Sequence, residues 1–329
     1  MKKYFKIIFI LAAIIFALTA CGIAYLIIKF PVTIAVENIK VQPTTERLNR
    51  GQYLVEHVVG CIDCHSQRDF SKYSGPIVEG TIGMGGFEFN RRLAGVPGSI
   101  YAKNITPAGI GDYSDGELLR VLTTGITKNN EALFPMMPYQ HYGNGVSRED
   151  LYSIIAYIKT LKPIVNKIPD RQLNFPMNLI VNTIPSPAYI PSSIPSVTDT
   201  VAYGKYMVNA AGCLDCHTRF IKGKPEAGME YAGGFEFTFP NGDVITTANL
   251  TPDLNTGIGA LSKENFIAKF KTFDNAAARN ISVGDHTKNT VMPWTALAGM
   301  SEQDLGAIYT FLRSLKPIER KIDSFRPGN

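Results

Sequence analysis

The feature that most constrains this chain is a five-residue pattern that it carries twice. Two cysteines separated by two residues are followed at once by histidine, as Cys61-Ile62-Asp63-Cys64-His65 and again as Cys213-Leu214-Asp215-Cys216-His217. In this pattern the thiols attach covalently to haem, and the histidine binds its iron. The sequence therefore predicts two covalently bound haem c groups, with His65 and His217 as the proximal iron ligands.

Zinc is the competing interpretation, because two Cys-x-x-Cys pairs can form one tetrahedral site. A shared zinc site would leave the histidine after each pair without a role, and it would have to join segments 152 residues apart. The fifth cysteine, Cys21, lies in an apolar N-terminal run, so no cysteine remains for a disulfide framework. Haem is therefore the favoured interpretation.

The two motifs belong to a longer internal repeat, which has to be recognised before any fold is assigned. In both halves of the chain, the motif is followed in the same order by a Gly-Gly-Phe-Glu-Phe run, an Asn-x-Thr-Pro run, a Met-Pro-aromatic run and a closing helical run. The paired segments lie 145 to 155 residues apart, at 85–89 and 233–237, 104–107 and 249–252, 137–139 and 292–294, and 157–163 and 311–317. The chain is one unit written twice.

Each unit is expected to be mainly α-helical. Residues 45–59 form an amphipathic run that leads to the first motif. The Ser-x-x-Glu pattern at Ser114 is a capping box, and it predicts a helix that ends at Gly125. Ser147 and Ser301 are expected to open the closing helices of the two units. The glycine-rich segments between these helices are expected to be loops with little sheet.

The expected organisation places a proline-rich connector between two domains. Prolines lack the backbone donor that helices and central strands need, so the connector is expected to be extended and semi-rigid, with part of it packed across a domain surface. The predicted ranges are a membrane segment at 1–30, a tether at 31–44, domain 1 at 45–167, the linker at 168–199, domain 2 at 200–321 and a tail at 322–329.

The N-terminus is expected to hold the chain on a membrane. Residues 7–28 are apolar and uncharged, and as a helix they would be about 33 Å long, enough to cross the hydrocarbon core. The lysines that precede this run favour a cytoplasmic N-terminus, an inner-membrane anchor and haem domains in the periplasm. Two alternatives stay open. Residues 18–21 resemble a bacterial lipobox that would acylate Cys21, and a cleaved secretory signal would release the chain.

Charge gives no sign of nucleic-acid binding. Four of the 33 basic residues lie in the first thirty positions, which hold no acidic residue, so 29 basic residues face 28 acidic ones in the rest of the chain. Nucleic-acid binding would call for a clustered basic face. The partners expected instead are the lipid bilayer and other redox proteins.

A six-coordinate haem iron needs a second axial ligand, and a methionine thioether in that place raises the potential. The candidates are Met137 and Met292, which follow their proximal histidines by 72 and 75 residues and precede a proline and an aromatic residue. Methionine often only fills core gaps, but the matching positions in the repeat favour a ligand role. Met136, Met84 and His141 remain as competitors in the first unit.

At these residues the chain resembles class I cytochrome c domains, and in particular the multihaem cytochrome subunits of membrane-bound alcohol and gluconate dehydrogenases. The resemblance covers roughly 49–163 and 202–317 and is carried by the runs at 104–107, 133–139 and 249–259, together with both closing helices. It departs from the family in one respect. Those subunits typically carry three haem motifs, and this chain has two.

The resemblance implies a fold and a set of site residues. The fold would be two tandem class I cytochrome c domains after the N-terminal segment. Loops at Asn104 and Asn249 would line the haem near its propionates. The resemblance also implies that the haem is bound by the motif residues, with histidine proximal and methionine distal: Cys61, Cys64, His65 and Met137 in domain 1, and Cys213, Cys216, His217 and Met292 in domain 2.

The function expected from these features is electron transfer without catalysis. The chain would take electrons from a membrane dehydrogenase or a quinol-oxidising complex and pass them to another cytochrome or an oxidase. The enzymatic alternative is a dihaem peroxidase or a thiosulfate-oxidising cytochrome, in which one iron keeps an open site. A haem sensor is disfavoured because the sequence has no signalling domain.

Overall fold

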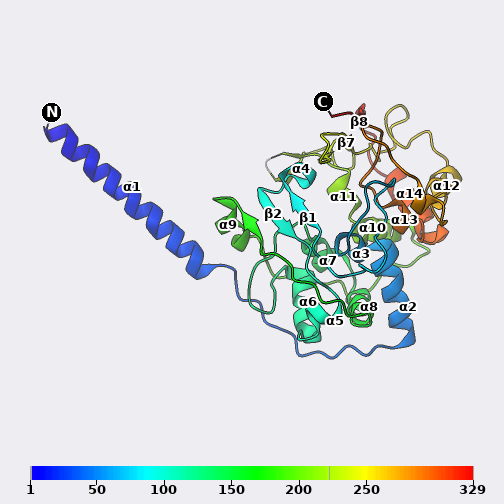
Figure 1. Ribbon diagram of the computed structural model, residues 1–329, viewed down its shortest axis with the longest axis horizontal. Helices are drawn as coiled ribbons and strands as arrows, with labels where there is room; N and C mark the ends of the chain where they lie inside the picture. The colour runs from blue at the N-terminus through cyan, green and yellow to red at the C-terminus, as the bar shows by residue number, and fades with distance from the viewer. Residues whose placement is uncertain (1, 222, 329) are drawn as a thin grey trace.

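The computed structural model describes residues 2–221 and 223–328. Helix α1, Lys2–Lys29, extends away from the rest of the chain, and none of its residues is buried (Figure 1). It is long and apolar enough to cross a membrane, and a signal sequence would have the same properties. The tether after α1 runs along the first unit, where Arg120 donates to the carbonyl of Ile34 and the N–H of Val41 donates to Asp115.

The first unit contains short helices and two short strands, which are joined by loops. Its elements are α2 (Thr45–Tyr53), the π-helical turn η1 (Leu54–Val58), α3 (Cys61–Cys64), β1 (Glu88–Asn90), α4 (Arg91–Ala94), β2 (Gly98–Tyr101), α5 (Pro107–Ile110), α6 (Asp115–Thr124), α7 (Tyr139–Gly145) and α8 (Arg148–Ile158). The connection to the second unit holds β3 (Gln172–Leu173), α9 (Met177–Ile180) and the 3-10 turn η2 (Val181–Thr183).

The second unit follows the same general order, but its described residues form two additional short strands and no helices corresponding to α4 and α5. Its elements are α10 (Thr200–Ala210), α11 (Cys213–Cys216), β4 (Phe220–Ile221), β5 (Lys224–Pro225), β6 (Glu236–Thr238), β7 (Val244–Thr246), α12 (Lys263–Lys271), the 3-10 turn η3 (Ala278–Asn280), α13 (Trp294–Leu297), α14 (Glu302–Arg313) and β8 (Phe325–Arg326).

The predicted helix signals are confirmed. Ser114 and Glu117 form a complete capping box at the start of α6, which ends at Gly125 in the left-handed conformation. The side chains of Ser147 and Ser301 accept hydrogen bonds from the third residue of α8 and of α14. These residues satisfy backbone groups that a helix end leaves without an intrahelical partner.

In each unit the first helix crosses the closing helix at a glycine. A Cβ atom at Gly51 of α2 would lie 2.0 Å from the backbone oxygen of Ser153 in α8, and one at Gly204 of α10 would lie 2.0 Å from that of Ala307 in α14. No residue with a side chain fits at such a crossing. The two glycines therefore let the helix pairs pack backbone to backbone, at the same position of the repeat.

A small antiparallel sheet closes each unit, in the order β1-β2-β3 and β6-β7-β8. The outer strands were not expected, because β3 lies inside the range assigned to the linker and β8 inside the range assigned to the tail. Gln172 pairs with Ser99, and Phe325 pairs with Ile245. The unpaired edges of β2 and β7 offer free backbone groups to the chain that follows the closing helix. The expected boundaries at 167 and 321 therefore cut through the sheets.

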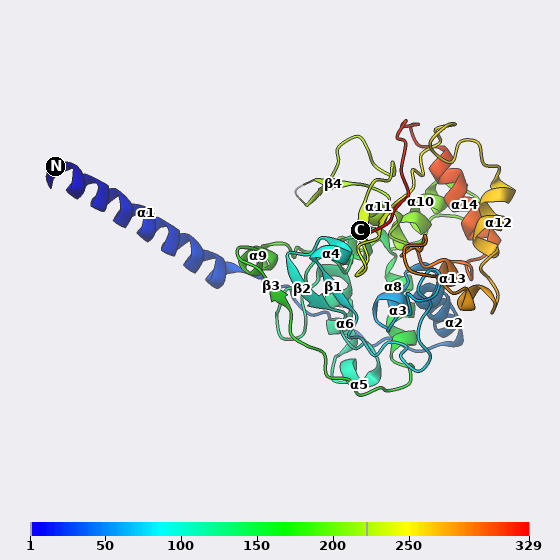
Figure 2. The same cartoon turned by 45° about the horizontal axis from the view of Figure 1, so that its top comes forward.

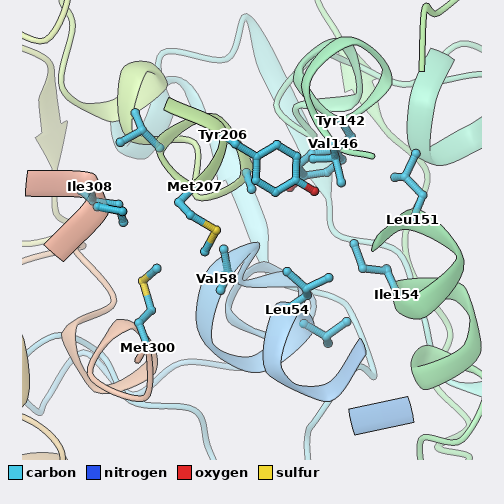
Figure 3. Close-up of a cluster of buried hydrophobic side chains, with 14 of the residues drawn as sticks. Leu54, Val58, Tyr142, Val146, Leu151, Ile154, Tyr206, Met207, Met300 and Ile308 are labelled. Carbon is cyan, nitrogen blue, oxygen red and sulfur yellow. The ribbon is translucent and has the colours of Figure 1, made fainter. Parts of the chain in front are cut away.

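The two units share one hydrophobic core. Figure 3 shows Leu54, Val58 and Tyr142 of the first unit in one cluster with Met207 and Met300 of the second. All five are buried. Helix α10 packs against α7, and η1, which directly continues α2, packs against α13. Figure 2 shows α13 next to α2. The contact is thus made twice, each time between the first helix of one unit and the helix after the Met-Pro run of the other.

Two tyrosines bind across this contact in the same way. Tyr206 of α10 donates to the carboxylate of Asp150 at 2.5 Å, and its oxygen accepts the N–H of Ser147 at 3.2 Å. Tyr53 of α2 donates to Asp304, and its oxygen accepts the N–H of Ser301 at 3.0 Å. Each tyrosine therefore caps the closing helix of the other unit, and the pair relates the units by an approximate two-fold symmetry.

Candidate functional site

Each Cys-x-x-Cys run folds into a single helical turn. Helices α3 and α11 follow glycines with φ of 66° and 64°, a left-handed conformation that glycine adopts without strain. The turn is closed by a hydrogen bond from the N–H of His65 to the oxygen of Cys61, and from His217 to Cys213. Residues three apart lie on one face of a helix, so both thiols of each pair point to the same side.

The histidine that follows each turn is fixed by a backbone carbonyl. Nδ1 of His65 lies 2.6 Å from the oxygen of Lys103, and Nδ1 of His217 lies 2.8 Å from the oxygen of Ala248. Burial lowers the pKa of both imidazoles, although the carbonyl contact partly opposes this. A neutral ring that donates from Nδ1 has its lone pair on Nε2, which is the arrangement of a metal-binding histidine.

The carbonyls that hold the histidines belong to the residues directly before the Asn-x-Thr loops. Asn104 Oδ1 accepts hydrogen bonds from the N–H and hydroxyl of Thr106, and Asn104 Nδ2 donates to Ile164 O. Asn249 makes the same bonds to Thr251 and to Ile318. Both asparagines are buried. Their amides are engaged in tying the loop to the segment after the closing helix, so they position the loop that holds the histidine.

The four thiols are free, and each is at least partly reachable by solvent. Burial among surrounding protein atoms nevertheless raises the pKa of Cys64 to about 11 and the pKa of Cys61, Cys213 and Cys216 to about 12. Two accessible, unpaired thiols on one side of a turn, next to an imidazole with a free Nε2, fit the attachment of a covalently bound haem.

The two Met-Pro-aromatic runs share one backbone turn. The N–H of Tyr139 donates to Met137 O at 2.8 Å, and the N–H of Trp294 donates to Met292 O at 2.8 Å. The proline between them has φ −81° and ψ 49° in the first unit, and φ −82° and ψ 65° in the second, close to an inverse γ-turn. Both methionines are partly buried and pack against the shared core.

Helix α7 of the first unit lies next to the cysteine turns of both units. The Nε2 atom of His141 is 3.4 Å from the carboxylate of Asp215, inside the second motif. Burial raises the pKa of Tyr142 well above its usual value, and Cys61, Cys64 and Asp215 add to the shift through their charges. His141 was considered from the sequence as a competitor for the first iron, and the structure places it against the motif of the other unit.

Comparison with known proteins identifies the second unit. Residues 201–316 match the family model of cytochrome c. This unit is a cytochrome c domain. A cytochrome c domain carries covalently bound haem c and functions in electron transport.

Relatives match both units. The chain is 27% identical over 284 residues to the gluconate 2-dehydrogenase cytochrome c subunit of Pantoea cypripedii, a match that covers 82% of this chain and 59% of that protein. It is 26% identical over 288 residues to the alcohol dehydrogenase (quinone) cytochrome c subunit of Gluconobacter oxydans, with 82% and 55% covered. A dihaem cytochrome c-type protein of Cereibacter sphaeroides is 26% identical over 271 residues, with 79% and 83% covered. The chain thus spans less than two thirds of the length of the first two relatives and most of the third.

Two groups of residues at the sites and at the contact between the units were not predicted from the sequence. One is the pair of interface tyrosines, Tyr53 and Tyr206, each of which stands two residues after a glycine ahead of its haem motif. Their partners lie far away in the sequence. The other is a loop of the first unit around Arg68 and Ser74, which reaches the Met-Pro run of the second. The sequence signal for this loop is its greater length, since 20 residues separate the histidine from the Gly-Gly run in the first unit and 16 in the second.

Proposed function

We propose that the chain is a dihaem electron carrier made of two tandem cytochrome c domains, each with one covalently bound haem c. Cys61 and Cys64 would attach the first haem and Cys213 and Cys216 the second, with His65 and His217 as proximal ligands. Met137 and Met292 would be the distal ligands, and Asn104 and Asn249 would act by holding the loops around the haem. Bound haem supplies one-electron chemistry, its iron alternating between ferrous and ferric states.

One observation carries this proposal: the first unit repeats the histidine geometry of the second. In both, Nδ1 contacts the carbonyl that precedes the Asn-x-Thr loop, at 2.6 Å for His65 and 2.8 Å for His217. A hydrogen bond from the ring nitrogen that does not bind the metal orients a ligating imidazole and raises its basicity. Since the second unit is a cytochrome c domain, the same ligand set in the first unit supports a second haem.

The shared core supports electron transfer between the two haems. Helix α7 touches the motif of the second unit through His141, while Tyr142 lies near the cysteines of the first. Buried cross-unit contacts hold the units in a single arrangement, so the distance between the attachment turns stays fixed. The residues of the α7–α10 contact would set the separation between the two haem-attachment turns.

We infer that helix α1 is a membrane anchor and that both domains face the periplasm. The basic residues before the apolar run support this orientation. A dehydrogenase or a quinol-oxidising complex would supply the electrons, and another cytochrome or an oxidase would receive them. The relatives that are cytochrome subunits of gluconate and alcohol dehydrogenases support a dehydrogenase as the donor.

The alternative is a dihaem peroxidase, in which one iron has an open coordination site. Carbon monoxide binding to the reduced protein separates the two functions. A carrier with two methionine-ligated irons is expected to bind little carbon monoxide, to turn over no peroxide and to show two reversible one-electron steps in a potentiometric titration. Carbon monoxide bound at half of the haem, together with peroxide turnover, would overturn the carrier proposal.

A further inference from the structure

A loop of the first unit grips the backbone around Met292 of the second. The hydroxyl of Ser74 donates to the carbonyl of Met292 at 2.6 Å and accepts the N–H of Trp294 at 2.9 Å. Ser74 is 1% exposed and has a φ of 67°. A single side chain of the first unit thus spans the inverse γ-turn that carries the proposed distal ligand of the second haem.

Arg68 and Asn289 fix this loop from both sides. The guanidinium of Arg68 donates to Gly75 O at 2.7 Å and to Ser74 O at 2.6 Å, and it also reaches Val291 O at 3.3 Å. Asn289, which is buried, accepts the N–H of Ser74 at 3.0 Å and donates to Phe70 O at 2.9 Å. The backbone is therefore held by the first unit on both sides of Met292.

The contact is asymmetric. Among the described residues, hydrogen bonds to the backbone of 137–139 come from within the first unit. The asymmetry follows from two differences between the repeats. The segment from the histidine to the Gly-Gly run is 20 residues in the first unit and 16 in the second, and the segment from the Asn-x-Thr run to the methionine is 33 and 43 residues. The contact between Ser74 and the Met292 turn forms where the longer segment of the first unit, 65–85, meets the longer segment of the second, 249–292.

We propose that Ser74 and Arg68 are positioning residues for Met292, so that the first unit controls how firmly the distal ligand stays on the second iron. This inference rests on the proposed function, because it takes Met292 as that ligand. A neutral thioether is a weak ligand that depends on the loop that presents it, and partners outside the ligand set tune such sites. Communication between the units thus runs through backbone contacts as well as through electron transfer.

Imidazole provides a direct test, because it replaces methionine on ferric haem when the methionine loop opens. The principal variant is Ser74→Gly in the full-length holoprotein, since glycine keeps the positive φ while it removes the hydroxyl. The matched control is Ser71→Gly, in which an exposed hydroxyl of the same loop is lost, one that contacts Asp69. Imidazole is titrated into the ferric protein, and the loss of the methionine–iron charge-transfer band is recorded for each haem.

For Ser74→Gly we expect imidazole to bind one of the two haems about tenfold more tightly, as the loss of bridging hydrogen bonds implies. The other haem and the Ser71→Gly protein are expected to match the wild type. Arg68→Lys keeps the positive charge but loses the planar guanidinium that donates several hydrogen bonds. It is expected to raise the imidazole affinity of the same haem. Unchanged imidazole affinity in both Ser74→Gly and Arg68→Lys would overturn the inference.

Met292→Ala separates this failure from a failure of the proposed function. In the first outcome, Met292→Ala abolishes half of the charge-transfer band while Ser74→Gly and Arg68→Lys leave imidazole binding unchanged. In that case Met292 is the ligand, but Ser74 and Arg68 do not determine how firmly it binds the iron. If Met292→Ala leaves the band intact, the ligand assignment is wrong, and the inference falls with it.

Discussion

The tyrosines that cross between the units offer a sharp test of the shared core. Replacing Tyr53 or Tyr206 by phenylalanine removes one hydroxyl and leaves the ring. Each hydroxyl donates to a buried carboxylate of the other unit and accepts an N–H at the start of its closing helix. A hydrogen bond to a charged group contributes about 1.5–3 kcal/mol, and a neutral one contributes about 1 kcal/mol.

The structure lowers the expected cost, because each carboxylate keeps a second partner. Asp304 still accepts from Tyr203 at 2.8 Å, and Asp150 still accepts from Arg50 at 2.8 Å. We therefore expect Tyr53→Phe and Tyr206→Phe each to reduce the free energy of unfolding by about 2 kcal/mol. The two hydroxyls bind different carboxylates, but Arg50 contacts the Tyr53 ring as well as Asp150, and Tyr203 stacks on Tyr206 as well as binding Asp304. The loss in the double variant is therefore expected to differ from the additive value of about 4 kcal/mol.

The assay is chemical denaturation of the holoprotein followed by far-ultraviolet circular dichroism. Tyr189→Phe is the matched control, because this side chain is 83% exposed. It is expected to stay within about 0.5 kcal/mol of the wild type. If Tyr53→Phe and Tyr206→Phe also stay within that limit, the tyrosines do not hold the units together and the reasoning is refuted.

Three further predictions follow from buried contacts. Burial is the main cause that raises the pKa of Tyr53 to about 12 from its ordinary value of 10. The unfolded chain therefore loses this proton at a lower pH than the folded chain, so the free energy of unfolding should fall between pH 10 and pH 12. Denaturation curves should show this fall, and it should be smaller in Tyr53→Phe. Gly204→Ala should destabilise by about 3 kcal/mol or more, because its Cβ would overlap the carbonyl of Ala307. Gly284→Ala, whose Cβ would lie at an ordinary van der Waals distance of 3.8 Å from Thr287, should be close to neutral in a thermal melt. Asn249→Ala should cost about 1–3 kcal/mol, the penalty for leaving the buried groups that it pairs without partners, and full stability in that variant would contradict its positioning role.

Local signals in the sequence predicted much of the fold. The capping residues Ser114, Ser147 and Ser301 bind backbone groups within three residues of themselves. The helix starts that they define can therefore be predicted from the local sequence. The same holds for the cysteine turns, whose geometry depends on four consecutive residues. The repeat then extended each local prediction to the other half of the chain.

Contacts between distant segments were beyond this reasoning. Strands β3 and β8 have two residues each and carry no alternating pattern, and they form because the edges of β2 and β7 lie beside them. The grip of Ser74 on Met292 joins residues 218 positions apart. The only sequence feature connected with this contact is that the segments that form it differ in length between the two repeats. Asn104 and Asn249 were expected to lie near the haem propionates, and in the structure their amide nitrogens tie the loops to the segments after the closing helices.

The central claim is that the chain is one haem-binding unit written twice. The intact mass of the holoprotein, measured under denaturing conditions, tests it most directly. Two covalently attached haems are predicted for the wild type. One is predicted for a variant with Cys61→Ala and Cys64→Ala, and one for a variant with Cys213→Ala and Cys216→Ala. A wild-type mass with a single haem, or loss of haem on denaturation, would contradict the account.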